Sequence, residues 1–379
     1  MSARSSKPVV QGWCPGAHRP MMSGDGLVVR VRPRLARLSA AQTLGLCELS
    51  ERFGNGTIDL TNRANLQLRG VAEADHRSLL AKLTALDLLD AEPGIEVRRN
   101  ILVSPLYQAD DLTARLAHEL IERLGELPAL PAKFGFAIDT VPKRQLAGDS
   151  ADIRLELGEA GLILRADGCE TGRSVTEGEA IDRLIDLAVW FSAHFTPETR
   201  RMARLISSRQ LPTQWLGDHP CAIGEPLEPG TYLLGPVYGA PFGQLPAKQL
   251  SDLIGKSGAV AMRVTPWRMF LLEDGAAISA PDFVTDGTDP LMTTDACPGA
   301  PLCPQAEVET RGIARELAQR VSGSLHVSGC TKGCARMGSA DITLVGSAGR
   351  FDLVKQGRAG DEPIQRGLTP ETLMTMDLT

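Results

Sequence analysis

The sequence predicts an α+β protein in which two pseudo-symmetric halves build one domain and two α/β domains complete the chain. Three observations support this: a length of 379 residues, which exceeds one ordinary domain, a strand-and-helix order that occurs twice, and four cysteines gathered near the C-terminal end. The pseudo-symmetric domain is expected to combine residues 20–90 with 228–285. Residues 91–227 and 286–379 are expected to form the other two domains.

The first half begins with a strand at 27–32, followed by a helix at 39–53 with Ser39 as its N-cap. Apolar and polar residues then alternate over 58–68, which predicts one half-buried strand. An amphipathic helix is expected at 75–88.

The same order returns with a helix at 245–258 and a strand at 259–275. The segments LTNRANLQLRG and VTPWRMFLLED can be superposed so that Thr61 matches Thr265. This weak internal repeat predicts that strands 58–68 and 259–272 pack in one domain, related by a pseudo-two-fold axis.

The region between the halves has its own pattern. Helices are expected at 110–124 and 177–193, and a hairpin at 152–157 and 162–166. Residues 206–230 are rich in Pro and Gly and predict a long connection.

Composition excludes several classes of function. A net charge of −6 and an aromatic content of 4% argue against a nucleic-acid partner. There is no run of eighteen apolar residues and no secretory apolar region, so we expect no membrane span and a cytoplasmic location.

The cysteines form two pairs, C-x5-C with Cys297 and Cys303, and C-x3-C with Cys330 and Cys334. Four thiolates are the ligand set of a [4Fe–4S] cluster, whereas structural zinc prefers closer spacing in both pairs. Buried free thiols are the remaining alternative. A helix expected at 304–320 would place Cys303 at its N-terminus.

Two other residues near this pattern have open interpretations. His326 could be a donor to the cluster or a metal ligand, but a satisfied or exposed histidine is the favoured interpretation. Cys14, in WCPGA, is interpreted as a loop cysteine near the pocket.

These motifs carry a family resemblance. CPGAPLCPQA and GCTKGCAR resemble the cluster-binding half of sulfite and nitrite reductases, LTNRANLQLRG resembles their sirohaem-cradling strand, and RRNILVSP resembles the segment after it. The resemblance covers about residues 20–360 and implies a sulfite/nitrite reductase-like fold with ferredoxin-like pseudo-repeats. Within that superfamily, GWCPGAHRPMMSGDGLVVRVR and HVSGCTKGCAR are most similar to the precorrin-3B synthases.

That resemblance implies an O₂-dependent monooxygenase of aerobic cobalamin biosynthesis. It would hydroxylate C20 of precorrin-3A and close a γ-lactone, with a [4Fe–4S] cluster, electrons from an external donor and an oxygen-activating centre such as an additional iron. The alternative is a sirohaem-dependent sulfite or nitrite reductase, but Gly135 stands where those enzymes have a second active-site lysine. A tetrapyrrole carrier or electron-transfer module is a non-enzymatic alternative.

The resemblance also assigns residues to the pocket. Matching positions make Arg30, Arg99 and Lys133 the catalytic candidates. The single strand expected at 58–68 would turn the odd-numbered residues to one face as a wall for the macrocycle, so the substrate-binding candidates are Thr61, Arg63, Asn65 and Gln67, together with Arg336. Further basic residues lie in the motif segments, where bidentate guanidinium groups suit a polycarboxylate: Arg32, Arg69, Arg98, Arg263, Arg268 and Lys332.

Overall fold

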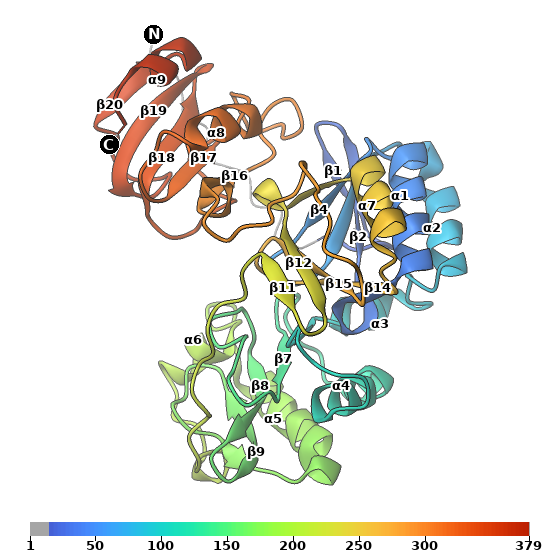
Figure 1. Ribbon diagram of the computed structural model, residues 1–379. Coiled ribbons are helices and arrows are strands. Elements are labelled where there is room, and N and C mark those ends of the chain that lie inside the picture. Colours follow the sequence, from blue (N-terminus) through green and yellow to red (C-terminus); the bar gives the residue numbers. More distant parts are fainter. Residues whose placement is uncertain (1–14, 379) are drawn as a thin grey trace.

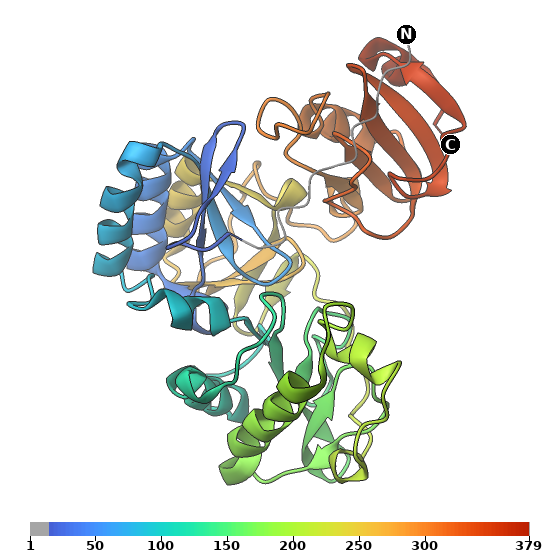
Figure 2. The same cartoon turned by 180° about the vertical axis from the view of Figure 1, so that it is seen from behind.

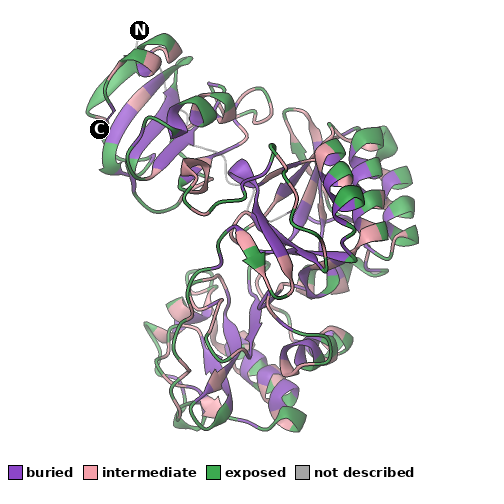
Figure 3. Ribbon diagram, viewed as in Figure 1, coloured by how far each residue is buried: buried purple, intermediate pink, exposed green. Residues whose placement is uncertain are grey.

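The computed structural model describes residues 15–378, so Cys14 lies outside the described part of the chain. The chain forms three lobes, with a central lobe between a middle-segment lobe and a C-terminal lobe (Figures 1 and 2). Two five-stranded sheets lie in the central lobe, and each of the other lobes contains one. The strands are mostly buried, whereas the outward faces of the helices are exposed (Figure 3).

The first half of the central lobe runs from β1 to α2. Its elements are β1 (Met21–Ser23), β2 (Gly26–Val31), β3 (Arg37–Ser39), α1 (Ala40–Phe53), β4 (Thr57–Leu60), β5 (Leu66–Val71) and α2 (His76–Ala85). The side chain of Ser39 accepts a hydrogen bond from the Gln42 backbone, and the Gln42 side chain accepts one from the Ser39 backbone. This capping box starts α1 where the sequence predicts it.

The second half repeats this order. Its elements are β11 (Gly230–Tyr232), β12 (Gly235–Gly239), β13 (Gln244–Pro246), α7 (Ala247–Ser257), β14 (Ala261–Val264) and β15 (Met269–Glu273). In each half a short helical turn with a positive φ precedes the third strand, at Leu35 (51°) and at Phe242 (59°). The two halves therefore share local backbone detail as well as element order.

The halves exchange their third strands. One sheet has the order β1-β2-β5-β4-β13 and the other β11-β12-β15-β14-β3, so β13 pairs with β4 and β3 pairs with β14. Helices α1 and α7 pack side by side on the flank that also carries α2 (Figure 1). The predicted assembly of two pseudo-symmetric repeats into one domain is confirmed.

The prediction of single strands at 58–68 and 259–275 is wrong, because each segment is a hairpin. The chain turns at 61–65 between β4 and β5, and at 265–268 between β14 and β15. Ala64 and Arg268 have φ angles of 51° and 58°, which breaks the alternation expected for a continuous strand. Thr61, Arg63, Asn65 and Gln67 consequently do not form one flat face.

Helix α3 (Pro93–Arg98) lies at the end of the central lobe that faces the middle lobe (Figure 1). The middle lobe holds β6 (Ile101–Val103), α4 (Leu112–Glu122), β7 (Phe136–Asp139), β8 (Ile153–Gly158), β9 (Gly161–Ala166), β10 (Arg173–Ser174), α5 (Ala180–His194) and α6 (Met202–Ile206). Its sheet has the order β10-β9-β8-β7-β6. Helices α4 and α5 and the β8–β9 hairpin lie where the sequence predicts them.

The C-terminal lobe contains β16 (Thr294–Ala296), α8 (Arg311–Ala318), β17 (Leu325–Ser328), β18 (Ala340–Ser347), β19 (Arg350–Gly357), β20 (Gln365–Leu368) and α9 (Pro370–Thr375). The helix expected at 304–320 begins only at Arg311. Cys303 therefore lies in a loop, and the argument from a helix N-terminus at this cysteine is wrong. The shorter helix places Arg311 in its first turn.

Candidate functional site

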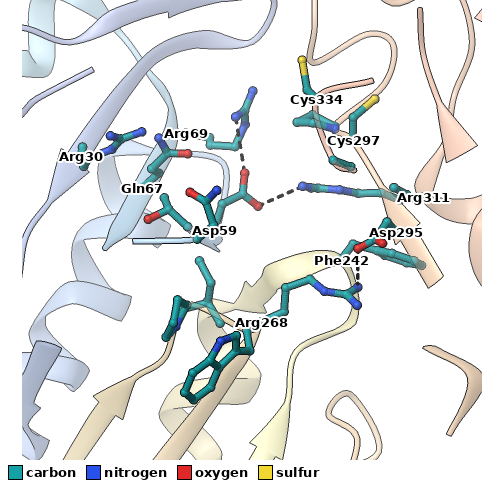
Figure 4. A pocket seen from close by; sticks show the side chains of 18 of the residues that line it. Arg30, Asp59, Gln67, Arg69, Phe242, Arg268, Asp295, Cys297, Arg311 and Cys334 are labelled. Carbon is teal, nitrogen blue, oxygen red and sulfur yellow. Dashed lines mark hydrogen bonds and ion pairs between the residues drawn. The ribbon is translucent and has the colours of Figure 1, made fainter. Parts of the chain in front are cut away.

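A cavity of about 740 Å³ lies between the first central sheet, the β14–β15 turn and the C-terminal lobe (Figure 4). This volume is within the usual range for ligand cavities. Basic, acidic, aromatic and thiol groups all line it: Arg30, Asp59, Thr61, Gln67, Arg69, Phe242, Trp267, Arg268, Asp295, Cys297, Arg311 and Cys334 are among its residues.

Two loops bring the four cysteines into one region. Cys297 and Cys303 belong to the loop between β16 and α8, and Cys330 and Cys334 follow β17. Burial raises the pKa of the Cys330 and Cys334 thiols, and the neighbouring cysteines raise the pKa of each further. The four sulfur atoms are therefore close enough to influence one another electrostatically.

The backbone around these cysteines is adapted to them. The Gly329 N–H donates to Cys297 Sγ at 3.1 Å, a bond that stabilises a thiolate. A Cβ at Gly329 would lie 2.5 Å from the Ala306 Cβ, so only glycine lets the two loops approach this closely. Four thiols from two abutting loops, with a backbone donor to one of them, fit the ligand set of an iron–sulfur cluster.

Within residues 15–378, no three His, Cys, Asp or Glu side chains converge as ligands of a single metal ion. A cube differs from such a site because each cysteine binds its own iron atom.

Three charged side chains meet where the first central sheet faces the C-terminal lobe. Asp59, on β4, accepts from Arg69 Nη1 at 3.4 Å and from Arg311 Nη2 at 3.2 Å. Arg311 Nε and Nη1 are buried and have no hydrogen-bond partner. A guanidinium in this state can bind a carboxylate that enters the cavity.

A second charged group joins the β14–β15 turn to the C-terminal lobe. Asp295 accepts from Arg336 Nε at 2.7 Å and lies 3.4 Å from Arg268 Nη1. Arg268 also donates to the Thr294 and Met292 carbonyls, at 2.6 and 2.5 Å. Burial lowers the pKa of Arg268. These contacts fix the β14–β15 turn to the C-terminal lobe.

The ring of His326 is fully buried on β17, the strand next to β16, and neither ring nitrogen has a hydrogen-bond partner. Burial lowers its pKa to about 4, which keeps the imidazole neutral.

The structure brings only part of the predicted pocket set to the cavity. Arg30, Thr61 and Gln67 line it, as do Arg69 and Arg268 from the wider basic set. Asn65 and Arg99 line a separate small cleft, and Arg63, Lys133 and Arg336 are not among the residues that line the cavity.

Arg99 is occupied by protein partners. Its side chain bonds Asp90 Oδ2 at 2.7 Å and the Arg32 carbonyl at 2.6 Å, and only 6% of it is exposed. Arg32 pairs in turn with the buried Glu96. These contacts join the end of β2 to α3. Arg99 therefore stabilises the fold and does not line the large cavity.

Arg63 reaches the middle lobe. Its Nη2 donates to the Lys133 carbonyl at 2.9 Å and to Ser150 Oγ at 3.1 Å. A Cβ at Gly135 would meet the Asn100 carbonyl at 3.0 Å and Arg63 Nη1 at 3.5 Å. Gly135 is therefore packed against Arg63 and Asn100.

The sequence interpretation missed Asp59, Trp267 and Arg311 as cavity residues. Asp59 directly precedes the motif that contains Arg63 and Arg69, and an acid so close to two arginines was an available signal. Arg311 had none, because its segment was assigned to the interior of a longer helix.

The pseudo-two-fold axis relates the charged residues of the large cavity to those of a second, smaller cavity. This second cavity has a volume of about 460 Å³ and lies between the central and middle lobes. The offset that matches Thr61 to Thr265 also matches Asp59 to Arg263 and Arg69 to Glu273. Glu273 pairs with Arg263, and with Arg37 at 2.7 Å. Each half therefore has an ion pair at the same two positions, but the acid and the base have exchanged places.

No helix among residues 15–378 combines the length and hydropathy needed to cross a bilayer.

Comparisons with known proteins agree with this architecture. Residues 19–86 match the family described as the nitrite/sulfite reductase ferredoxin-like half domain. The structure of the Mycobacterium tuberculosis NirA protein superposes with a TM-score of 0.68 at 20% identity, over 92% of this chain and 79% of that one. This likeness shows the shared fold.

Two curated relatives are informative at the level of sequence. A ferredoxin–nitrite reductase from Synechococcus elongatus is 24% identical over 88% of this chain and 78% of its own length. A precorrin-3B synthase from Sinorhizobium sp is 31% identical over 93% of this chain and 84% of its own length. The chain belongs to the precorrin-3B synthase family, within the sulfite and nitrite reductase superfamily.

Proposed function

We propose that this protein is a monooxygenase that converts precorrin-3A into precorrin-3B. One oxygen atom of O₂ forms the hydroxyl group at C20, and the other is reduced to water with two electrons and two protons that derive from an external donor. The carboxylate of the ring-A acetate adds to C1 and closes the γ-lactone without losing an atom. The product therefore exceeds the substrate by one oxygen.

The observation that carries this proposal is the composition of the 740 Å³ cavity. Its wall combines arginines for carboxylates with two of the four clustered cysteines. Precorrin-3A is a polycarboxylate macrocycle, and guanidinium groups bind carboxylates with paired, charge-assisted hydrogen bonds. Arg311 offers two buried guanidinium nitrogens, Nε and Nη1, without partners for this purpose.

The side chains of the cavity bind and orient the substrate. Arg30, Arg69 and Arg311 bind acetate and propionate arms, and Thr61 and Gln67 supply neutral hydrogen bonds. Arg63, Asn65, Arg99, Lys133 and Arg336, which lie outside the cavity, support the position of the surrounding segments.

A [4Fe–4S] cluster held by Cys297, Cys303, Cys330 and Cys334 would supply electrons to the reaction. Arg69 and the β1–β2 turn contribute to the position of this region. Gly24 N and Ser23 Oγ donate to the Leu302 carbonyl, at 3.0 and 2.7 Å, next to Cys303. The wall that binds substrate is thereby joined directly to a cysteine loop.

The test begins with anaerobically purified protein. A broad absorption shoulder without strong Soret bands is expected, because a cluster without sirohaem lacks them. Precorrin-3A is then added with a photochemical reductant and ¹⁸O₂, and the product is analysed by mass spectrometry. We expect one labelled oxygen atom per product molecule.

A Cys330→Ser variant is the matched control and should form no product. Stoichiometric sirohaem in the wild-type protein would favour a sulfite or nitrite reductase instead. Product without label, or product formed without O₂, would overturn the proposed reaction.

A further inference from the structure

The cavity has two aromatic side chains in its wall, and they differ in accessibility. Phe242 is 7% exposed, and the Arg315 guanidinium lies over its ring at 5.6 Å. Trp267 is only partly buried. Its indole packs against two hydrophobic clusters and also lines the cavity. Trp267 therefore presents the more accessible aromatic surface to a bound ligand.

The backbone of Trp267 is held in place on both sides. Thr265 closes the turn, because its N–H and hydroxyl both donate to the Met269 carbonyl, at 3.1 and 2.8 Å. Arg268 follows and is tied to the C-terminal lobe through Thr294 and Asp295. An indole on such a turn loses little conformational entropy when a ligand stacks on it.

The plane of the indole is set from another lobe. Trp267 Nε1 donates to Asp149 Oδ2 at 3.1 Å, and Asp149 lies on the loop between β7 and β8 of the middle lobe. This hydrogen bond fixes the rotation of the ring, which packing alone leaves open.

The pseudo-two-fold axis strengthens this interpretation. The offset that matches Thr61 to Thr265 matches Arg63 to Trp267. Arg63 donates to Ser150 Oγ at 3.1 Å, so the tips of both equivalent turns bond adjacent residues of one loop. Only the second turn carries an aromatic residue, and only that residue, of the two, lines the large cavity.

We propose that Trp267 is the stacking surface for the macrocycle, and that Asp149 is the positioning residue that orients its indole from the middle lobe. The proposal rests on the proposed function, since it assumes a tetrapyrrole in this cavity. It adds a specificity element: a flat, conjugated ligand gains contact with the indole that a small anion such as sulfite or nitrite cannot gain.

The test uses metal-free uroporphyrin III, a stable uroporphyrinoid, titrated into the anaerobic protein. Trp267→Ala should weaken binding roughly tenfold or more, as loss of an aromatic stacking partner does elsewhere. Trp267→Phe should restore most of the affinity. Trp215→Phe is the matched control, because Trp215 is buried in the middle lobe and does not line the cavity. It should leave affinity unchanged.

The role of Asp149 needs a readout that depends on orientation. The circular dichroism induced in the Soret band of bound uroporphyrin depends on the angle between the macrocycle and nearby aromatic rings. Asp149→Ala should change this signal and weaken binding several-fold, and Asp149→Asn, which keeps an acceptor oxygen, should restore both.

The outcomes separate the two proposals. Saturable binding that is equal in wild type and Trp267→Ala would overturn the stacking role and leave the proposed function standing. Absence of binding to wild type would overturn the tetrapyrrole site, and the stacking surface with it. An Asp149→Ala variant with an unchanged induced signal would overturn the positioning role.

Discussion

Asp59→Asn should have opposite effects on stability and on ligand binding. Asp59 is the carboxylate that compensates Arg311 within the described chain, and it also contacts Arg69. Arg69 keeps a second acid, Asp25, at 3.6 Å. Arg311, whose side chain is 12% exposed, would then have no ion pair with any residue among 15–378.

The expected changes in unfolding free energy and in affinity follow from the loss of the carboxylate partner of Arg311. Removing one partner of a buried ion pair costs roughly 3–5 kcal/mol. The asparagine carbonyl still accepts a hydrogen bond, so we expect a loss of about 3 kcal/mol in the free energy of unfolding, the lower end of that range. A substrate carboxylate would then replace the lost charge. One extra charge-assisted bond, at about 1.5–3 kcal/mol, makes binding roughly ten- to a hundredfold tighter.

The assay combines anaerobic urea denaturation, followed by far-ultraviolet circular dichroism, with titration of uroporphyrin III. Glu273→Gln is the matched control, because Glu273 occupies the pseudo-symmetric ion pair with Arg263 and lies outside the large cavity. It should lower stability similarly and leave affinity unchanged. Unchanged or weaker binding by Asp59→Asn, with the iron content intact, would refute the reasoning.

Three further outcomes are expected. Cys330→Ser should lose or degrade the cluster while Cys47→Ser retains it; iron and sulfide assays measure this, and full iron in the first variant would contradict the ligand assignment. Arg311→Ala should weaken uroporphyrin binding roughly ten- to a hundredfold because its two unpartnered guanidinium nitrogens are removed, and equal affinity in the titration would remove Arg311 from the site. Burial raises the pKa of Asp139 to about 6, so the folded protein retains a proton that the unfolded chain releases near pH 4. The free energy of unfolding should therefore fall by about 2–3 kcal/mol as pH rises from 4 to 6, and Asp139→Asn should remove that part of the slope in urea titrations at each pH.

The repeat and the cysteine pairs could be predicted from sequence because each depends on local spacing. Thr61 and Thr265 mark equivalent turns, and the motif order fixed the pairing of the halves. The hairpin at 61–65 was missed because the alternation was carried across Asn62, which interrupts it at a position where an apolar residue is expected. Asparagine is a common turn residue, so this signal was present.

The cavity residues were harder to predict because they meet across lobes. Arg311 contacts Asp59 only when the C-terminal lobe packs on the first central sheet. Asp149 reaches Trp267 across a comparable boundary. Neither pair has a local pattern, whereas Arg99 lies in a recognisable motif yet bonds Asp90, nine residues earlier in the chain. Motif membership alone therefore did not separate cavity residues from structural ones.

The exchange of β3 and β13 has a consequence for the history of this chain. Each sheet is completed by a strand from the other half, which is the geometry of a strand-swapped homodimer. Joining two such subunits through an inserted lobe gives one chain in which the two equivalent sheets are encoded separately. After that fusion, each sheet could change independently. One sheet now pairs Asp59 with its arginines, and the other carries the reversed pair of Arg263 and Glu273. A symmetric dimer of this kind would have two equal cavities, whereas those of this chain differ in volume, at about 740 and 460 Å³, and in the sign of the residues that line them.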